Sequence, residues 1–105
     1  MTESRSHRRA KRKAAGPGGR TEVPLRSGKR LDAKTTKTAT EVERSGNLGN
    51  LTQAAKRLKE SGAPRKVLQV PQHDMSKAAI AMMKAGVGGT VKNMSGTRRR
   101  SVPKK

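Results

Sequence analysis

The sequence predicts an α/β fold, a small mixed β-sheet with helices packed on it, in the order β-β-β-α-β-α-(β). Alternating apolar and polar residues over residues 21–33 are typical of a hairpin. Between residues 39 and 70, a strand pattern, a helix pattern and a second strand pattern follow one another. That passage has the length of a right-handed crossover, which would make its two strands parallel neighbours.

The first three strands are expected at residues 21–25, 29–33 and 39–43. Ser27 and Gly28 form the turn signal between the first two strands. Pro24 has no backbone N–H to donate, so the first strand should lie at an edge of the sheet.

A helix is predicted over residues 50–61, with Gly62 at its C′ position, followed by a short strand over residues 67–70. Asp74 is expected to cap a second helix that ends before Gly86, and a last short strand lies between residues 87 and 94. The apolar residues of the first helix recur at helical spacing, at Leu51, Ala54, Ala55 and Leu58.

The composition allows one small domain. Only 30% of the 105 residues are hydrophobic and none is aromatic, so a large catalytic domain is excluded. The absence of Cys and the wide separation of the two His residues speak against a zinc module. The sequence has neither an apolar run long enough for a membrane span nor a visible secretory signal. We therefore expect a soluble protein without a membrane partner, located in the cytoplasm or associated with a virion.

The charge predicts a nucleic-acid partner. The chain has 26 Lys and Arg residues against 7 acids, a formal net charge of +19. The common RNA modules and single-strand binders stack bases on aromatic rings, and this chain has none. DNA is expected as the partner in preference to RNA. Residues 1–20 are expected to form a disordered basic arm, residues 21–97 the domain, and residues 98–105 a basic tail. The candidate phosphate contacts are Arg8, Arg9, Lys11, Arg12, Lys13, Lys29, Arg30, Arg44, Arg98, Arg99 and Arg100.

Four of the seven acids fall within residues 22–43, where a basic protein has little use for carboxylates. Strand alternation places Glu41 and Glu43 on one face, and Glu22 and Asp32 on the faces opposite their apolar neighbours. We expect all four to converge on one side of adjacent strands. Clustered carboxylates repel unless a cation neutralises them, and oxygen ligands select Mg²⁺ or Mn²⁺. Beside a basic groove, such an ion would serve phosphodiester hydrolysis.

Three segments carry a family resemblance: Gly19-Arg-Thr-Glu-Val-Pro-Leu25, Gly28-Lys-Arg-Leu-Asp32 and Ala39-Thr-Glu-Val-Glu43. Over residues 19–70 the chain resembles the PD-(D/E)XK, or restriction-endonuclease-like, nuclease superfamily. The resemblance implies that Asp32 and Glu41 are metal ligands and that Glu22 matches an accessory acid. Glu43 stands where the family usually has Lys. The family also has a helix before its first strand, and the basic arm shows no apolar face for one.

The sequence thus predicts a small Mg²⁺- or Mn²⁺-dependent endonuclease with Glu22, Asp32, Glu41 and Glu43 as catalytic residues. Lys29, Arg30 or Arg44 would steady the developing negative charge. The alternative is a non-catalytic nucleic-acid-binding protein, such as a ribosome-associated, packaging or virion DNA-binding component. An exposed strand face with its carboxylates paired to cations would explain Glu41 and Glu43 equally well. Whether the chain acts alone or as a homodimer stays open.

Overall fold

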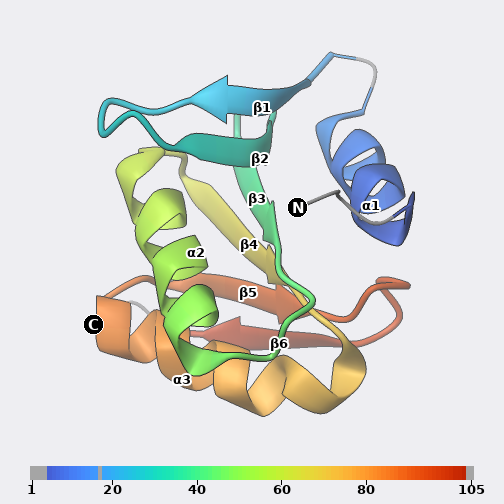
Figure 1. The fold of residues 1–105 in the computed structure, drawn as a ribbon, viewed down its shortest axis with the longest axis vertical. Coiled ribbons are helices and arrows are strands. Elements are labelled where there is room, and N and C mark those ends of the chain that lie inside the picture. The colour runs from blue at the N-terminus through green and yellow to red at the C-terminus, as the bar shows by residue number, and fades with distance from the viewer. Residues whose placement is uncertain (1–4, 17, 104–105) are drawn as a thin grey trace.

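A computed structural model describes residues 5–16 and 18–103 of the chain. The described elements form one sheet with helices against it (Figure 1). In chain order they are α1 (Arg5–Ala15), β1 (Arg20–Pro24), β2 (Arg30–Lys34), β3 (Thr38–Val42), α2 (Leu48–Glu60), β4 (Arg65–Gln69), the 3-10 turn η1 (Gln72–Asp74), α3 (Met75–Ala85), β5 (Gly89–Lys92) and β6 (Arg99–Val102).

The sheet is mixed, and its six strands lie in chain order from β1 to β6. Strands β3, β4 and β5 are parallel to one another, whereas the β1–β2, β2–β3 and β5–β6 pairs are antiparallel. The predicted α/β class, the hairpin and the crossover from β3 through α2 to β4 are confirmed. Strand β1, which carries Pro24, lies at the edge of the sheet as predicted.

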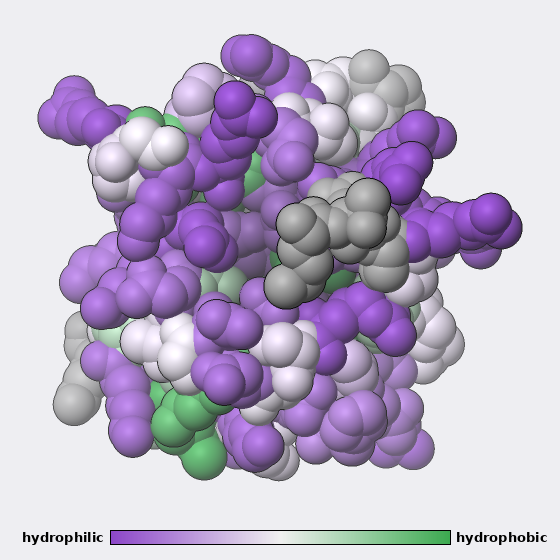
Figure 2. All heavy atoms as spheres, viewed as in Figure 1, coloured by the Kyte–Doolittle hydropathy of each residue, from purple (hydrophilic) through white to green (hydrophobic). Residues whose placement is uncertain are grey.

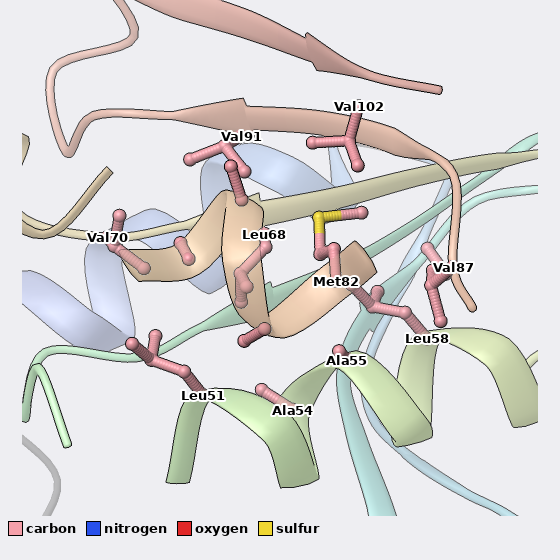
Figure 3. Close-up of a cluster of buried hydrophobic side chains, with 14 of the residues drawn as sticks. Leu51, Ala54, Ala55, Leu58, Leu68, Val70, Met82, Val87, Val91 and Val102 are labelled. Carbon is pink, nitrogen blue, oxygen red and sulfur yellow. The ribbon is translucent and has the colours of Figure 1, made fainter. Parts of the chain in front are cut away.

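The hydrophobic core lies between the sheet and the pair of helices α2 and α3. Leu51 and Leu58 of α2 are fully buried, and they share the core with Met82 of α3 and Leu68 of β4 (Figure 3). Because no aromatic side chain is present, small and branched aliphatic residues fill this layer. The helical spacing of the α2 apolar residues therefore predicted its buried face correctly.

Helix α1 is the main departure from the sequence prediction, which placed a disordered arm over residues 1–20. It lies on the side of the sheet away from α2 and α3 and contacts β1, β2 and β3 (Figure 1). Its contact face is built from alanines, and Ala10 and Ala15 are buried. Alanine has the highest helix propensity but contributes little apolar area, so this face was not recognised as a packing surface. Residues 1–4 of the predicted arm lie outside the described residues.

Strand β6 lies within the segment predicted to be a basic tail. It pairs with β5 in antiparallel register, and Val102 is buried in the core. Three of the four residues of β6 are polar, so the strand has little apolar surface to bury. Its hydrogen bonds to β5 stabilise it as an edge strand. Residues 104 and 105 of the tail lie outside the described part of the chain.

The helix ends follow the predicted signals with one exception. Gly62 and Gly86 have φ values of 69° and 72°, the left-handed conformation expected after a helix C-terminus. Asp74, predicted to cap α3, makes no side-chain cap hydrogen bond. With ψ near 1°, Asp74 is not in the extended conformation that lets a capping side chain reach the first turn.

The surface is dominated by polar and charged side chains, which Figure 2 shows over most of the face in view. Among residues 5–16 and 18–103, no helix has both the length and the apolar character needed to cross a bilayer. Three large apolar side chains are nevertheless exposed, at Leu48, Ile80 and Met83.

Candidate functional site

The structure brings Asp32 and Glu41 together at the point where β2 and β3 separate. In the paired part of the two strands, Ala33 lies opposite Thr40 and Lys34 lies opposite Ala39. The pairing does not extend to Asp32. There, the Asp32 Oδ2 atom accepts the Val42 backbone N–H at 2.8 Å. A side-chain oxygen thus takes the place of a backbone acceptor, and it holds the Asp32 carboxylate in the gap between the strands.

Glu41 approaches this gap from the side of α2. It is paired with Leu68 of β4, which is paired with Val91 of β5, and both of these residues belong to the core. Side chains in one such row share a face of the sheet, so Glu41 faces α2. Its side chain is only 2% exposed, and its Oε1 atom accepts a hydrogen bond from Arg57 Nη1 of α2 at 3.4 Å. A nearly fully buried carboxyl therefore sits at the margin of the apolar core.

Burial and the neighbouring carboxylate change the protonation of this pair. Loss of solvent, a hydrogen bond with Asp32 and the charge of Asp32 raise the pKa of Glu41 to about 10. Burial alone would also raise the pKa of Asp32, but hydrogen bonds from His7, Glu41 and the Val42 N–H outweigh it and leave that pKa below its usual value. At neutral pH, Asp32 is the anion and Glu41 the acid of a pair that shares one proton.

Two residues of α1 contact the carboxyl pair from the other side of the sheet. His7 Nε2 lies 3.3 Å from Asp32 Oδ2. The ammonium of Lys11, which is 4% exposed, lies 3.1 Å from Glu22 Oε1 and 4.0 Å from Asp32 Oδ1. Positions 7 and 11 are one helical turn apart, so both side chains lie on the same face of α1. The sequence prediction had placed Lys11 in an exposed phosphate-binding arm and had given His7 no role.

The four acids do not converge on one side of the sheet, contrary to prediction. Glu22 has a φ of 51°, and its carboxylate contacts Lys11, whose ammonium lies between it and Asp32. Glu43 follows the end of β3, and its Oε1 atom accepts the Ser45 N–H at 3.0 Å. The alternation argument also assumed that helices cover one face of the sheet. Helices pack on both faces, so Glu41 lies on the α2 side with Leu68, whereas Asp32 and Glu22 lie beside Lys11 on the α1 side.

The carboxyl pair fits a Mg²⁺ or Mn²⁺ ion in the chemistry of its ligands. Within the described residues, no group of three or more His, Cys, Asp or Glu side chains is placed to hold a metal ion. Mg²⁺ keeps several waters and is often bound through one or two carboxylates together with substrate phosphates. Asp32 and Glu41 are two such oxygen donors on adjacent strands, and they are the residues that would hold an ion, which would have to displace the proton of Glu41.

The cations predicted to contact phosphate lie in several places. Arg8, Arg9, Arg12 and Lys13 are exposed on α1, and Arg98, Arg99 and Arg100 are exposed at or before β6. Lys29, Arg30 and Arg44 are also exposed, and the Lys29 Nζ atom donates to Gln53 Oε1 at 2.9 Å rather than approaching the carboxyl pair. Lys11 is thus the cation found beside Asp32.

A wide basic groove runs from the end of α1 across the strands β3 to β6. It encloses about 1100 Å³, and no acid contributes to its lining among the described residues. A groove with one sign of charge concentrates anions along its length. The cations along it are Lys13, Lys59, Arg65, Lys66, Lys92 and Arg99.

Sequence reasoning missed two residues of this site, His7 and Arg57. The available signal was the repetition of alanines on α1 at Ala10, Ala14 and Ala15, which marks one face of the helix and so the position of His7. Arg57 carried no signal of its own, because its contact with Glu41 depends on how α2 packs on the sheet. Comparison with family models, with curated protein sequences and with solved structures gives no match for this chain.

Proposed function

We propose that this protein is a small Mg²⁺- or Mn²⁺-dependent endonuclease that hydrolyses phosphodiester bonds, with DNA as the preferred substrate. The observation that carries the proposal is the buried Asp32–Glu41 pair. Two carboxyls that share a hydrogen bond and are largely removed from water destabilise a fold unless a proton or a cation lies between them. Within the described residues, Lys11 lies 4.0 Å from Asp32 and Arg57 lies 3.4 Å from Glu41, and a divalent ion in place of the shared proton would neutralise the pair more fully.

The element order supports the same proposal. The succession α1, β1, β2, β3, α2 and β4, with β3 and β4 parallel, contains the hairpin, third strand, crossover helix and fourth strand of the nuclease superfamily that the sequence resembles. Helix α1 also supplies the helix expected before the first strand. Asp32 on β2 and Glu41 on β3 stand at the positions that the resemblance assigns to the metal ligands.

The residues around the pair have distinct roles in this proposal. A divalent ion bound by Asp32 and Glu41 would supply polarisation of the phosphodiester and a water of lowered pKa. The Val42 N–H and His7 hold the Asp32 carboxylate in one orientation, and Arg57 does the same for Glu41. These contacts restrict the two side chains before substrate arrives, as a preorganised site requires.

In this proposal Lys11 provides the charge stabilisation that the sequence prediction assigned to Lys29, Arg30 or Arg44. Its ammonium is held beside Asp32 and Glu22 by α1, so it is a fixed positive charge next to the carboxyl pair. Such a charge stabilises the negative charge that develops on phosphate oxygens during hydrolysis. The usual family Lys stands at position 43, where this chain has Glu, and Lys11 provides an ammonium from a different element.

The test is a plasmid-nicking assay with Mg²⁺ or Mn²⁺, run beside gel shifts in chelator on the same variants. Asp32→Asn and Glu41→Gln are nearly isosteric, and we expect each to lower cleavage at least a hundredfold while leaving DNA affinity unchanged or improved. Glu60→Gln, an exposed acid far along α2, is the matched control and should cut as the wild type does.

Two outcomes would overturn the proposal. If the purified wild-type chain cuts neither DNA nor RNA with any divalent ion, the chain is a nucleic-acid-binding protein without catalysis. If Asp32→Asn cuts as well as the wild type, the activity belongs to another site or to a contaminant.

A further inference from the structure

A second pocket lies beneath α1, on the side of the sheet opposite the core. It encloses about 400 Å³, a size within the range of small-ligand sites. Gln69 of β4 and Lys92 of β5 form its floor, and they lie in one row of the sheet with Val42. Ser6, Arg9 and Lys13 line it from α1, and Ser95 lines it from the loop between β5 and β6.

Gln69 carries a buried acceptor that is unused among the described residues. The residue is 5% exposed, and its Nε2 atom donates to the carbonyl oxygens of Met94 at 2.9 Å and Asn93 at 3.3 Å. These two acceptors fix the orientation of the amide, because its oxygen cannot face them. The Oε1 atom is left buried without a hydrogen-bond partner in this part of the chain. A buried acceptor without a donor destabilises the fold, so a bound molecule that supplies a donor to it gains affinity.

Cations converge on the same pocket. Burial lowers the pKa of Lys92, and the nearby charges of Arg99 and Lys13 lower it further. Arg9 and Lys13 line the pocket from α1, and no acid is present in its described lining. Like charges brought this close repel one another, and an anion placed between them removes the repulsion.

The pocket therefore offers a site for an anion beside an acceptor that requires a donor. Phosphate alone supplies the first, whereas a nucleotide supplies both, through its phosphate and an N–H or O–H of its base or sugar. Lys13 and Lys92 also line the basic groove described above, so a chain of nucleotides can continue from one into the other. This continuity favours a strand over a free nucleotide.

We infer that the pocket beneath α1 binds one nucleotide unit of a polynucleotide strand, with Lys92, Lys13 and Arg9 on its phosphate and Gln69 Oε1 accepting from its base or sugar. The inference rests on the proposed function in that it gives the substrate a binding position beyond the carboxyl pair. It predicts that contacts made away from the cleaved bond contribute to strand affinity.

The experiment titrates the full-length chain, in chelator, with 5′-phosphorylated hexathymidylate and follows the side-chain amide signals of Gln69 by NMR. We expect these signals to shift on strand binding and to stay in place with inorganic phosphate, which lacks the second group. Lys92→Gln should weaken strand affinity at least fivefold, and Arg9→Gln at an exposed position should weaken it at least threefold. Lys77→Gln, an exposed cation on α3 away from both the pocket and the groove, is the matched control and should change affinity less than twofold.

Equal losses for Lys92→Gln, Arg9→Gln and Lys77→Gln would overturn the inference, because they would show binding through general charge. Gln69 amide signals that do not move at saturation would also overturn it. These results are separate from the cleavage test. A chain that cuts nothing and passes this titration loses the nuclease function and keeps the nucleotide pocket, whereas a chain that cuts and fails the titration loses only the pocket.

Discussion

The Asp32 carboxylate on β2 accepts the backbone N–H of Val42 on β3, with 2.8 Å between oxygen and nitrogen. One aspartate thus completes the hydrogen bonding between two strands and also presents its charge to Glu41, His7 and Lys11. Because the same side chain serves the fold and the candidate site, its substitutions separate into those that keep the acceptor and those that remove it.

Asp32→Ala should destabilise the fold, and Asp32→Asn should do so much less. Alanine leaves the Val42 N–H without an acceptor, which costs about 1–3 kcal/mol for a partly buried donor. Asparagine keeps an oxygen in the same position. Urea unfolding of the two variants beside the wild type measures the difference. Equal stability of the Ala and Asn variants would show that the hydrogen bond does not hold β2 against β3.

Without a bound metal, we expect the chain to lose stability as the pH rises above 5. Glu41→Gln should reduce this loss. The folded-state pKa of Glu41 lies near 10, above the ordinary value of 4.5. The stability from its bound proton is complete below pH 4.5 and is lost as pH rises toward 10, by on the order of 1 kcal/mol per pH unit. Gln has no proton to lose, so the melting temperatures of the two proteins should separate by several degrees between pH 5 and pH 8.

The pKa of Asp32 is shifted in the opposite direction, so Asp32 affects stability in a different pH range from Glu41. The range from pH 5 to pH 8 therefore reports on Glu41. The lowered pKa of Asp32 gives stability that is present above its ordinary value of 3.8 and is lost as the pH falls below it. Between pH 5 and pH 8 this contribution is constant. A Glu41→Gln variant whose melting temperature runs parallel to the wild type over that range would contradict the raised pKa of Glu41.

Millimolar Mn²⁺ should raise the melting temperature of the wild type, and more at pH 8 than at pH 6. A ligand bound only by the folded state stabilises it by RT ln(1 + [L]/Kd), and the ion must displace the proton that the carboxyl pair shares. The apparent affinity should therefore rise with pH, up to about tenfold per unit. Asp32→Asn should abolish the shift, and Glu60→Gln should retain it. Thermal melts with Mn²⁺, Mg²⁺ and chelator provide the measurement, and the absence of a shift at both pH values would argue against a metal site.

Replacing both Arg5 and Arg12 with Gln should flatten the salt dependence of DNA binding without unfolding the chain. Both side chains are exposed on α1. Log affinity falls with log salt by about 0.9 for each neutralised phosphate, so the loss of two contacts should reduce the slope by about twice that amount. Binding titrations at several salt concentrations, with thermal melts as a folding control, test this prediction. An unchanged slope would show that the outer face of α1 does not contact phosphate.

Much of the fold was predictable because its signals are local. The hairpin follows from the alternation around Ser27 and Gly28, and α2 follows from the spacing of Leu51 and Leu58. Helix α1 and strand β6 were not predicted, since their few buried residues are mostly alanines on α1 and a single Val102 on β6. Such segments become regular only when a partner surface is present, and a pattern read along the chain does not reveal that surface.

The sequence by itself determined the α/β class and the basic character of the surface, because alternation and charge are properties of neighbouring residues. Asp32 and Glu41 were singled out by the family resemblance, whereas alternation grouped all four acids. The tertiary structure decided that Glu43 contacts Ser45 instead of the pair, that Glu22 reaches Asp32 only through Lys11, and that His7 and Arg57 contact the pair from opposite sides of the sheet. It also decided that Gln69, which lines the pocket beneath α1, has a buried acceptor without a hydrogen-bond partner in the described part of the chain. Those contacts join residues from separate elements, so they depend on how β2 and β3 diverge and on where α1 packs, neither of which any local pattern specifies.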